Sequence, residues 1–129
     1  MKVSDIMIGD FVYNPQQELC KICEIQGIGI PYVTTDNYAH DDGTFYQYAV
    51  SEIEPIPLTA EILEKNGFKR CNQEFALKTW TNDTVDFILV EVMEEEHTWR
   101  VENTLASLCH VHEFQHMLRL CGIDKEVIV

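Results

Sequence analysis

The sequence predicts an α+β protein with an N-terminal β-module, residues 1–55, followed by a small α+β module, residues 56–129. Three observations predict this fold class. Residues 1–50 alternate short apolar runs with turn residues, which is typical of short strands. Residues 54–57, Glu-Pro-Ile-Pro, form a stiff connector. Helical patterns with capping residues occur only beyond that connector. The same pattern is compatible with one compact domain, given the length of 129 residues.

Turn residues divide the N-terminal module into four candidate strands. Asn14-Pro15 and the Asp-Asp-Gly of residues 41–43 are turn signals, and Gly27 and Gly29 interrupt the chain between them. The expected strands are residues 11–13, 19–25, 30–33 and 44–50. Short strands at this spacing predict a curled sheet or a small SH3-like barrel.

The C-terminal module begins with a helix expected over residues 59–66. Thr59 is a good N-cap, Leu58 is placed to pack on Leu63, and Gly67 suits the left-handed C-cap position. Strands are then expected at residues 75–80, 85–92 and 98–101. A second helix is predicted over residues 111–121, followed by a short final strand at residues 126–129.

Composition bounds the class of protein and its location. The chain is 46% hydrophobic and 24% charged, which suits a soluble protein with a real core. No run of about 18 apolar residues predicts a membrane-spanning helix, and the first residues lack the apolar stretch of a signal peptide. Five cysteines, an odd number, indicate reduced thiols. We therefore expect a cytoplasmic protein.

The charge balance bounds the partners. The formal net charge is −13, from 22 acidic and 9 basic residues. Ordinary nucleic-acid binding relies on Lys and Arg to neutralise phosphates, so it is disfavoured, and anionic membrane surfaces are disfavoured for the same reason. Acidity fits solubility, a basic protein partner or mimicry of nucleic acid. Self-association is left open.

One string suggests catalysis. His112-Glu113-Phe114-Gln115-His116 matches His-Glu-x-x-His, in which two imidazoles one helical turn apart bind zinc and the Glu acts as general base. A catalytic zinc site also needs a third protein ligand and an open position. No further His follows closely, because His116 is succeeded by Met-Leu-Arg-Leu-Cys-Gly. The candidate ligands are therefore His112 and His116, with Glu113 as candidate base, in an incomplete centre.

The alternative interpretation is a helix that packs on a core. At about 100° per residue, the apolar residues of the second helix share one arc that we expect to face inward: Val111, Phe114, Met117, Leu118 and Cys121. The polar residues share the opposite side, which we expect to face solvent: His112, Gln115, His116 and Arg119. Under this interpretation the two histidines are not metal ligands.

A second candidate metal string is Cys20-Lys21-Ile22-Cys23. The Cys-x-x-Cys spacing occurs in zinc sites and redox pairs. On a strand, however, side chains alternate, so Cys20 and Cys23 are expected on opposite faces. No second Cys-x-x-Cys follows. We therefore expect two ordinary strand cysteines, with no disulfide and no structural zinc.

Three segments of the chain resemble an uncharacterised family of small proteins encoded by gut bacteria and by their phages and mobile elements. They are residues 1–6 and 8–13, residues 56–59 and 61–68, and residues 111–116 with 118 and 120–122. In that family Val111, His112 and Gln115 correspond to shared positions, whereas Glu113 and His116 are frequently replaced. The resemblance therefore implies a docking helix, an extended segment near residues 105–110 and a bacterial cytosol, but no biochemical activity.

Three hypotheses follow for function. The first is a non-catalytic binding protein that modulates a host process, and the second is a zinc hydrolase built on His112, Glu113 and His116. The third is a protein that sequesters a small ligand such as a nucleotide. Aromatic side chains would stack on the base: Phe45, Tyr46, Tyr48, Trp80 and Trp99. Basic side chains would meet the phosphates: Lys69, Arg70 and Arg100. The first hypothesis expects no cofactor.

Overall fold

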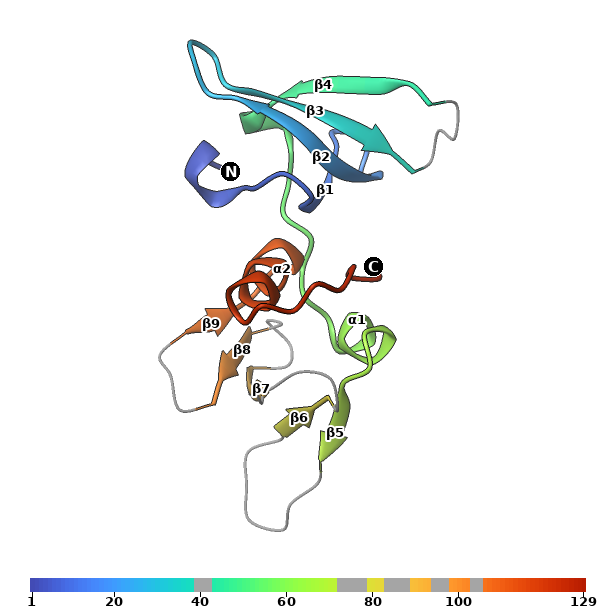
Figure 1. Ribbon diagram of the computed structural model, residues 1–129, viewed down its shortest axis with the longest axis vertical. Helices are drawn as coiled ribbons and strands as arrows, with labels where there is room; N and C mark the ends of the chain where they lie inside the picture. The colour runs from blue at the N-terminus through green and yellow to red at the C-terminus, as the bar shows by residue number, and fades with distance from the viewer. Residues whose placement is uncertain (39–42, 72–78, 83–88, 94–97, 103–105) are drawn as a thin grey trace. The chain divides into compact units, whose positions relative to one another are not determined.

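The computed structural model describes residues 1–38, 43–71, 79–82, 89–93, 98–102 and 106–129. Its contacts divide the chain into two compact units, Met1–Ile56 and Pro57–Val129. Each unit has its own antiparallel sheet, and helices of more than one turn occur only in the described part of the second (Figure 1). The α+β class expected from the sequence is confirmed. Within the described residues, no helix is long and apolar enough to span a membrane.

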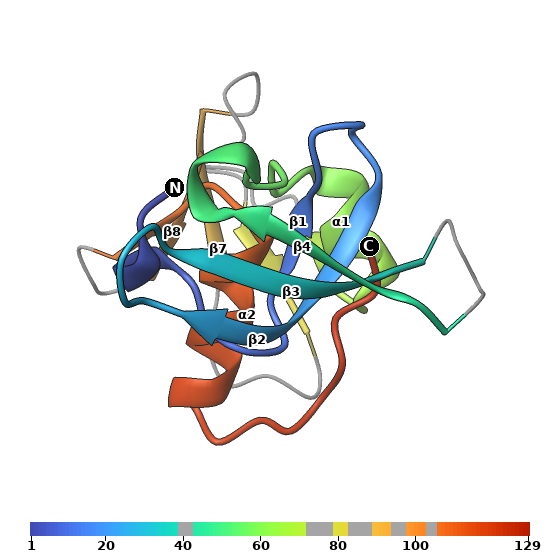
Figure 2. The ribbon, with the colours of Figure 1, turned by 90° about the horizontal axis from the view of Figure 1, so that it is seen from above.

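The N-terminal unit is a four-stranded sheet in the order β1-β2-β3-β4. Its strands are β1 (Phe11–Tyr13), β2 (Leu19–Gln26), β3 (Tyr32–Asn37) and β4 (Phe45–Ala49). Figure 2 shows β2, β3 and β4 lying side by side. Two 3-10 turns flank the sheet, η1 (Val3–Asp5) and η2 (Val50–Glu52). The four expected strands are confirmed, although β3 begins and ends later than the sequence suggested.

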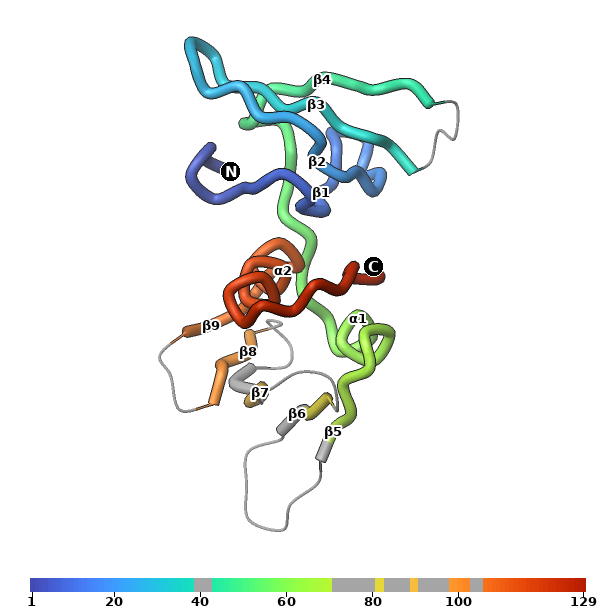
Figure 3. The backbone as a smooth tube through the Cα atoms, viewed as in Figure 1, coloured from blue at the N-terminus to red at the C-terminus, as the bar shows by residue number. Residues whose placement is uncertain are grey.

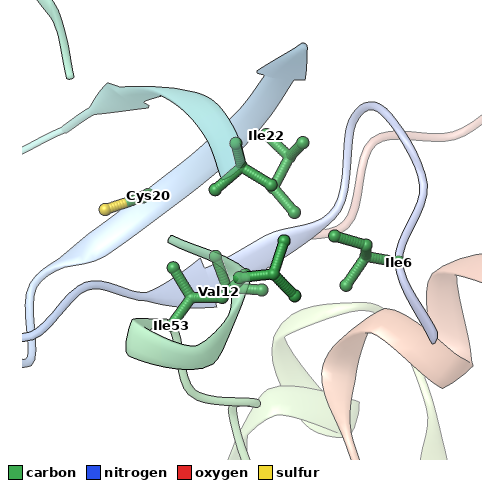
Figure 4. Close-up of a cluster of buried hydrophobic side chains, with 7 residues drawn as sticks. Ile6, Val12, Cys20, Ile22 and Ile53 are labelled. Carbon is green, nitrogen blue, oxygen red and sulfur yellow. The ribbon is translucent and has the colours of Figure 1, made fainter. Parts of the chain in front are cut away.

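One face of this sheet carries the core of the unit. Val12, Cys20, Ile22 and Val33 come from three neighbouring strands and are at most 1% exposed. Ile6, Val50 and Ile53 lie outside the strands and complete the same cluster (Figure 4). Burying one such aliphatic side chain contributes about 1.5–3 kcal/mol. The alternation of apolar and polar residues along β2 and β3 therefore determines which face of the sheet turns inward.

Buried polar side chains join the turns of this unit to its strands. Asn14 is fully buried, and its Oδ1 accepts the backbone N–H groups of Gln16 (3.0 Å) and Glu18 (2.8 Å). The Nδ2 groups of Asn14 and Asn37 donate to the hydroxyl of Tyr48, at 3.3 and 3.1 Å. These contacts satisfy amides that would be costly to bury alone. They also fix the orientation of Tyr48 toward the core face.

The C-terminal unit has a sheet in the order β5-β6-β7-β8-β9 and two helices. The elements are β5 (Lys69–Cys71), β6 (Thr79–Thr81), β7 (Leu89–Met93), β8 (Thr98–Val101), β9 (Ser107–Leu108), α1 (Ala60–Lys65) and α2 (Val111–Leu120). The strand expected at residues 98–101 is confirmed. Those expected at 75–80 and 85–92 are confirmed where residues are described, in β6 and β7; residues 72–78 and 83–88 lie outside the description. Strand β5 was not expected from the sequence.

The caps of α1 follow the sequence closely. The hydroxyl of Thr59 accepts the N–H of Ile62 at 3.2 Å, as an N-cap does. Gly67 has φ +89°, and the N–H of Phe68 donates to the carbonyl of Leu63 at 3.0 Å. This is a Schellman ending, which needs a residue that tolerates positive φ. Thr59 and Gly67 therefore fix where α1 begins and ends.

The last segment of the chain differs from the prediction. Residues 126–129 form no strand and pair instead with a side chain. Asn66 is 5% exposed, its Nδ2 donates to the carbonyl of Ile128 at 2.7 Å, and its Oδ1 accepts the N–H of Ile128 at 2.8 Å. A side-chain amide presents the same donor and acceptor as a backbone, so it replaces a strand partner here. Val127 is 4% exposed, which explains the apolar pattern that suggested a strand.

Candidate functional site

The start of α2 is organised by Glu113. His110 is the N-cap residue, with an extended backbone (φ −133°, ψ 155°). One carboxylate oxygen of Glu113, Oε1, accepts the backbone N–H of Cys109 at 3.3 Å and lies 2.6 Å from Nδ1 of His110. An ionised carboxylate only accepts, so this contact places the hydrogen on Nδ1 of His110. Glu113 therefore satisfies a backbone donor at the helix start, where its negative charge also complements the helix dipole.

The segment before α2 is held from a second direction. The N–H of Leu58 donates to the carbonyl of Cys109 at 2.9 Å, and Pro57 forms an antiparallel bridge with His110. The fully buried Trp99 donates its ring N–H to the carbonyl of Leu58 at 2.6 Å. The beginning of α2 is therefore fixed by backbone pairing and by a core tryptophan, as well as by Glu113.

Three imidazole rings lie in a row along this helix start. The rings of His110 and His112 are stacked, with centroids 5.6 Å apart and an interplanar angle of 16°. The rings of His112 and His116 meet edge to face, with centroids 5.7 Å apart. His112 is 6% exposed. Helical spacing thus brings His112 and His116 together, as expected for residues one turn apart.

The pair of histidines lacks a third ligand in the part of the chain that the structure describes. Among those residues, no group of three or more His, Cys, Asp or Glu side chains is arranged to hold a metal ion. Zinc in a hydrolase takes three protein ligands and keeps one position for water. His112 and His116 supply two imidazoles, while Oε1 of Glu113 is in contact with His110. Within the described residues, the cluster therefore presents two of the three ligands that such a zinc site needs.

The buried arc of α2 is rotated relative to the prediction. Val111, Phe114 and Leu118 are at most 4% exposed, as expected. However, His112 and Gln115 are also buried, each 6% exposed, which is contrary to the solvent-facing position predicted for them. At about 100° per residue, Gln115 lies about 40° from Val111 and His112 about 100° from it. The helix therefore buries polar residues on one flank of its apolar arc.

On the other flank of the apolar arc, a residue that was expected to be buried is exposed to solvent. Cys121, predicted to face the core, is the C-cap residue and is exposed. The preceding Leu120 is 82% exposed. The helix ends at Leu120. Gly122 (φ +72°) follows the C-cap, and the N–H of Ile123 donates to the carbonyl of Leu118 at 2.9 Å. Phe114 contributes to the core through its ring, whose centroid lies 5.7 Å from that of Phe68, edge to face.

The two cysteines of the Cys-x-x-Cys string of β2 differ in their surroundings. Cys20 is fully buried and Cys23 is exposed, so the prediction that they lie on opposite faces is confirmed. A bulge between Ile22 and Glu24 interrupts the pairing at Cys23. Burial raises the pKa of the Cys20 thiol to about 11. A thiol that stays protonated at neutral pH is neither a good metal ligand nor a good nucleophile.

The aromatic residues proposed to stack on a nucleotide differ in burial. Trp99 is fully buried and Tyr48 is hydrogen-bonded within the core of the N-terminal unit, whereas Phe45 is 60% exposed. Tyr46 neighbours Phe45 on β4 and therefore lies on the opposite face of the sheet. The side chain of Trp80 lies outside the description.

The basic residues proposed to meet phosphate are also divided. Lys69, Arg70 and Arg100 are all exposed. Through the cross-strand pairs from β5 to β8, Arg70 belongs to the same row of residues as Val101. Arg100 precedes Val101 on β8 and belongs to the adjacent row. Adjacent rows face opposite sides of a sheet. Arg70 and Arg100 therefore do not form one phosphate-binding surface on this sheet.

His110 is the member of this cluster that sequence reasoning missed. Its position three residues before Glu113 is the spacing of an N-cap and a side chain that reaches back to it. That spacing is present in the sequence, but it overlaps the match to His-Glu-x-x-His, which favours zinc.

Comparison of the chain with protein-family models, with curated proteins and with solved structures finds no match.

Proposed function

We propose that this chain is a non-catalytic binding protein, and that its His-Glu-x-x-His string is the start of a packed helix. The observation that carries this proposal is the engagement of Glu113 with the N–H of Cys109 and with the His110 ring. A general base must reach the water or substrate proton that it removes. In this chain the same carboxylate accepts the N–H of Cys109, and His112 beside it is buried.

The partner that we propose is a basic protein of a bacterial host. The net charge of −13 favours a positively charged surface and accelerates its encounter with this chain. The resemblance to small proteins of gut bacteria, phages and mobile elements supports a role in modulating a host process in the cytosol. The free thiols of Cys20, Cys23, Cys109 and Cys121 are compatible with a reducing compartment.

We also propose that the N-terminal unit is an SH3-like barrel. In that fold the final strand follows a 3-10 turn and returns to pair with the first strand. Here η2 follows β4, and Glu54 then pairs with Tyr13 of β1 through two backbone hydrogen bonds of 2.9 Å. Small barrels of this kind commonly present loops and edges to partners, which is consistent with an interaction protein.

The test is a comparison of wild-type protein with Glu113→Gln. Both proteins are supplied with zinc and assayed against peptide, ester and phosphodiester substrates, and metal content is measured after dialysis. We expect no hydrolysis and no stoichiometric zinc in either protein. A hydrolytic activity that depends on zinc and is lost in Glu113→Gln would overturn the proposal.

The binding half of the proposal needs its own measurement. Proteins of a bacterial cytosol that cross-link to the chain are identified, purified and titrated against it by calorimetry. We expect a basic partner whose dissociation constant rises with salt, because screening weakens attraction between opposite charges. Retention of the same affinity in Glu113→Gln would show that the contact does not use the proposed zinc string. Failure of every cross-linked protein to bind after purification would contradict the proposal.

A further inference from the structure

Strand β4 is an unusual edge for a natural sheet. Among the residues that the structure describes, it is the last strand in the order β1-β2-β3-β4, and its residues are Phe-Tyr-Gln-Tyr-Ala. Edge strands are commonly protected by charged residues, by proline or by a bulge. The sequence of β4 contains no charge and no proline, and its described pairing with β3 has no register shift. This strand therefore lacks the usual protection against addition of another strand.

The hydrogen-bond pattern shows which residues of β4 present their backbone outward. The N–H of Val50 donates to the carbonyl of Pro31 at 2.9 Å, next to the pair Tyr32–Ala49. Bonded and non-bonded pairs alternate along an antiparallel ladder. Tyr46 and Tyr48 consequently direct their backbone groups toward β3. The outward-directed groups belong to the alternate residues of the strand: Phe45, Gln47 and Ala49.

The side chains of β4 divide in the same way. Tyr48 packs against the core of the N-terminal unit and is hydrogen-bonded there. Phe45 is 60% exposed, and Gln47 on the same face is also exposed. The residues with outward backbone groups thus carry uncharged side chains that leave room for a neighbouring strand.

We propose that two copies of this chain pair through β4, antiparallel about a two-fold axis at Gln47. In this register Gln47 lies opposite the partner's Gln47, and Phe45 lies opposite the partner's Ala49. All three pairs are of the bonded type and together exchange about six backbone hydrogen bonds. The large Phe45 meets a small residue, so the register also avoids steric crowding on the exposed face.

The uncharged sequence of β4 suits a second copy of this chain better than a basic peptide. Residues 1–56 contain two basic residues, Lys2 and Lys21, and nine acidic ones: Asp5, Asp10, Glu18, Glu24, Asp36, Asp41, Asp42, Glu52 and Glu54. A basic peptide along β4 would meet no carboxylate on the strand itself. Two acidic copies, in contrast, can meet at this strand, because none of its paired residues Phe45, Gln47 and Ala49 carries a carboxylate.

Exposed apolar residues lie beyond the end of the same edge. Ile28 and Ile30 are each 83% exposed in the turn that joins β2 to β3. Figure 3 shows this turn extending past the end of β4 that is formed by Ala49. In the antiparallel register that end of one copy meets the Phe45 end of the other. The pairing therefore gives Phe45, Ile28 and Ile30 an apolar neighbourhood that a single copy lacks.

The size of the contact sets the strength that we expect. Pairing of two short strands with a few apolar residues buries less than about 1,200 Å², which is the range of weak and transient complexes. The net charge of each copy opposes association, and salt screens that repulsion. We therefore expect a reversible dimer with a micromolar or weaker dissociation constant that tightens as salt is raised. A contact based on opposite charges would show the reverse dependence.

Sedimentation of the full chain at several concentrations, at about 50 and 500 mM salt, tests the proposal, since these values bracket strong and weak screening. Gln47→Lys places two like charges opposite each other on the axis, and we expect it to weaken the dimer at least about tenfold. Gln16→Lys is the matched control, because it makes the same change in charge at an exposed turn position. Gln47→Pro removes an outward N–H, which an edge strand tolerates, and is expected to abolish the dimer with the melting temperature retained.

Amide exchange locates the contact. We expect the N–H groups of Phe45, Gln47 and Ala49 to gain protection as the dimer forms, while those of Tyr46 and Tyr48 are protected at every concentration. A protein that is monomeric at all concentrations and both salts would overturn the proposal. So would equal effects of Gln47→Lys and Gln16→Lys, or a dimer that weakens with salt. Protection of Gln47 in dilute monomer would also overturn it, because another part of the same chain would then occupy the edge.

Discussion

The two strings that resemble metal sites differ in secondary structure, and their side chains are engaged in different ways. Cys20 and Cys23 lie on a strand, where alternation and a bulge place one thiol in the core and the other in solvent. His112 and His116 lie on a helix, where the spacing does bring the two rings together. In the helix, the carboxylate of Glu113 accepts the N–H of Cys109 and contacts the His110 ring. A spacing motif therefore needs both the right secondary structure and side chains that are not already engaged.

The largest effect should come from the residue that docks α2. Phe114 is 1% exposed and its ring contacts Phe68. Phe114→Ala removes a buried ring and leaves a cavity, so we expect a loss of about 3–5 kcal/mol in the free energy of unfolding. Denaturant unfolding measures this loss. Leu120→Ala is the control on the same helix, because Leu120 is 82% exposed and should change stability by less than about 0.5 kcal/mol. Equal losses would show that α2 is not docked through Phe114.

The second largest effect is a loss of folding stability at alkaline pH, which we expect from Cys20 but not from Cys23 on the same strand β2. Burial raises the pKa of Cys20 from 9.0 to about 11, so the folded protein keeps this proton after the unfolded chain has lost it. The contribution of the protonated thiol to the free energy of unfolding is complete below pH 9. It is lost as the pH rises from about 9 to 11, and the total loss is about 2–3 kcal/mol. Stability measured across this range should fall more steeply for wild type than for Cys20→Ala.

The matched control for that slope is Cys23→Ala. Cys23 is exposed and lies on the same strand, so its replacement should leave the alkaline slope of wild type unchanged. Other groups that titrate in this range contribute equally to all three proteins. A slope that is the same in Cys20→Ala as in wild type would indicate that the Cys20 thiol is accessible to solvent when folded.

Local signals in the sequence accounted for most of the fold. The caps at Thr59 and Gly67 and the alternation along β2 act within a few residues, and the structure has them as predicted. The final segment could not be predicted in this way. Its apolar pattern is real, since Val127 is buried, but its partner is the side chain of Asn66, which is 62 residues from Ile128 along the chain.

Most residues of the candidate site could be predicted from the sequence, but their contacts and burial could not. The helical period correctly placed His112 near His116, but apolarity alone placed the buried arc too far from His112 and Gln115. The spacing of apolar residues marks only the centre of the buried face, whereas packing also buries polar residues that flank the arc. Glu113 contacts His110, the N-cap residue three positions earlier. That spacing between an N-cap and the third helical residue is the sequence signal that identifies this contact.

The smallest effect, and the one that most directly separates the two interpretations of α2, should come from His116→Ala. His116 meets His112 edge to face but is itself partly exposed, so we expect a change in stability below about 1 kcal/mol. In a zinc protein the same substitution would remove a ligand and release the metal. Metal content and melting temperature, with and without a chelator, should therefore be alike for wild type and His116→Ala. His112→Ala provides the contrast, because His112 is 6% exposed and its loss should destabilise the helix start without any effect on metal. If purified wild type carries one zinc that either substitution removes, the histidines are ligands and the docking interpretation of α2 is wrong.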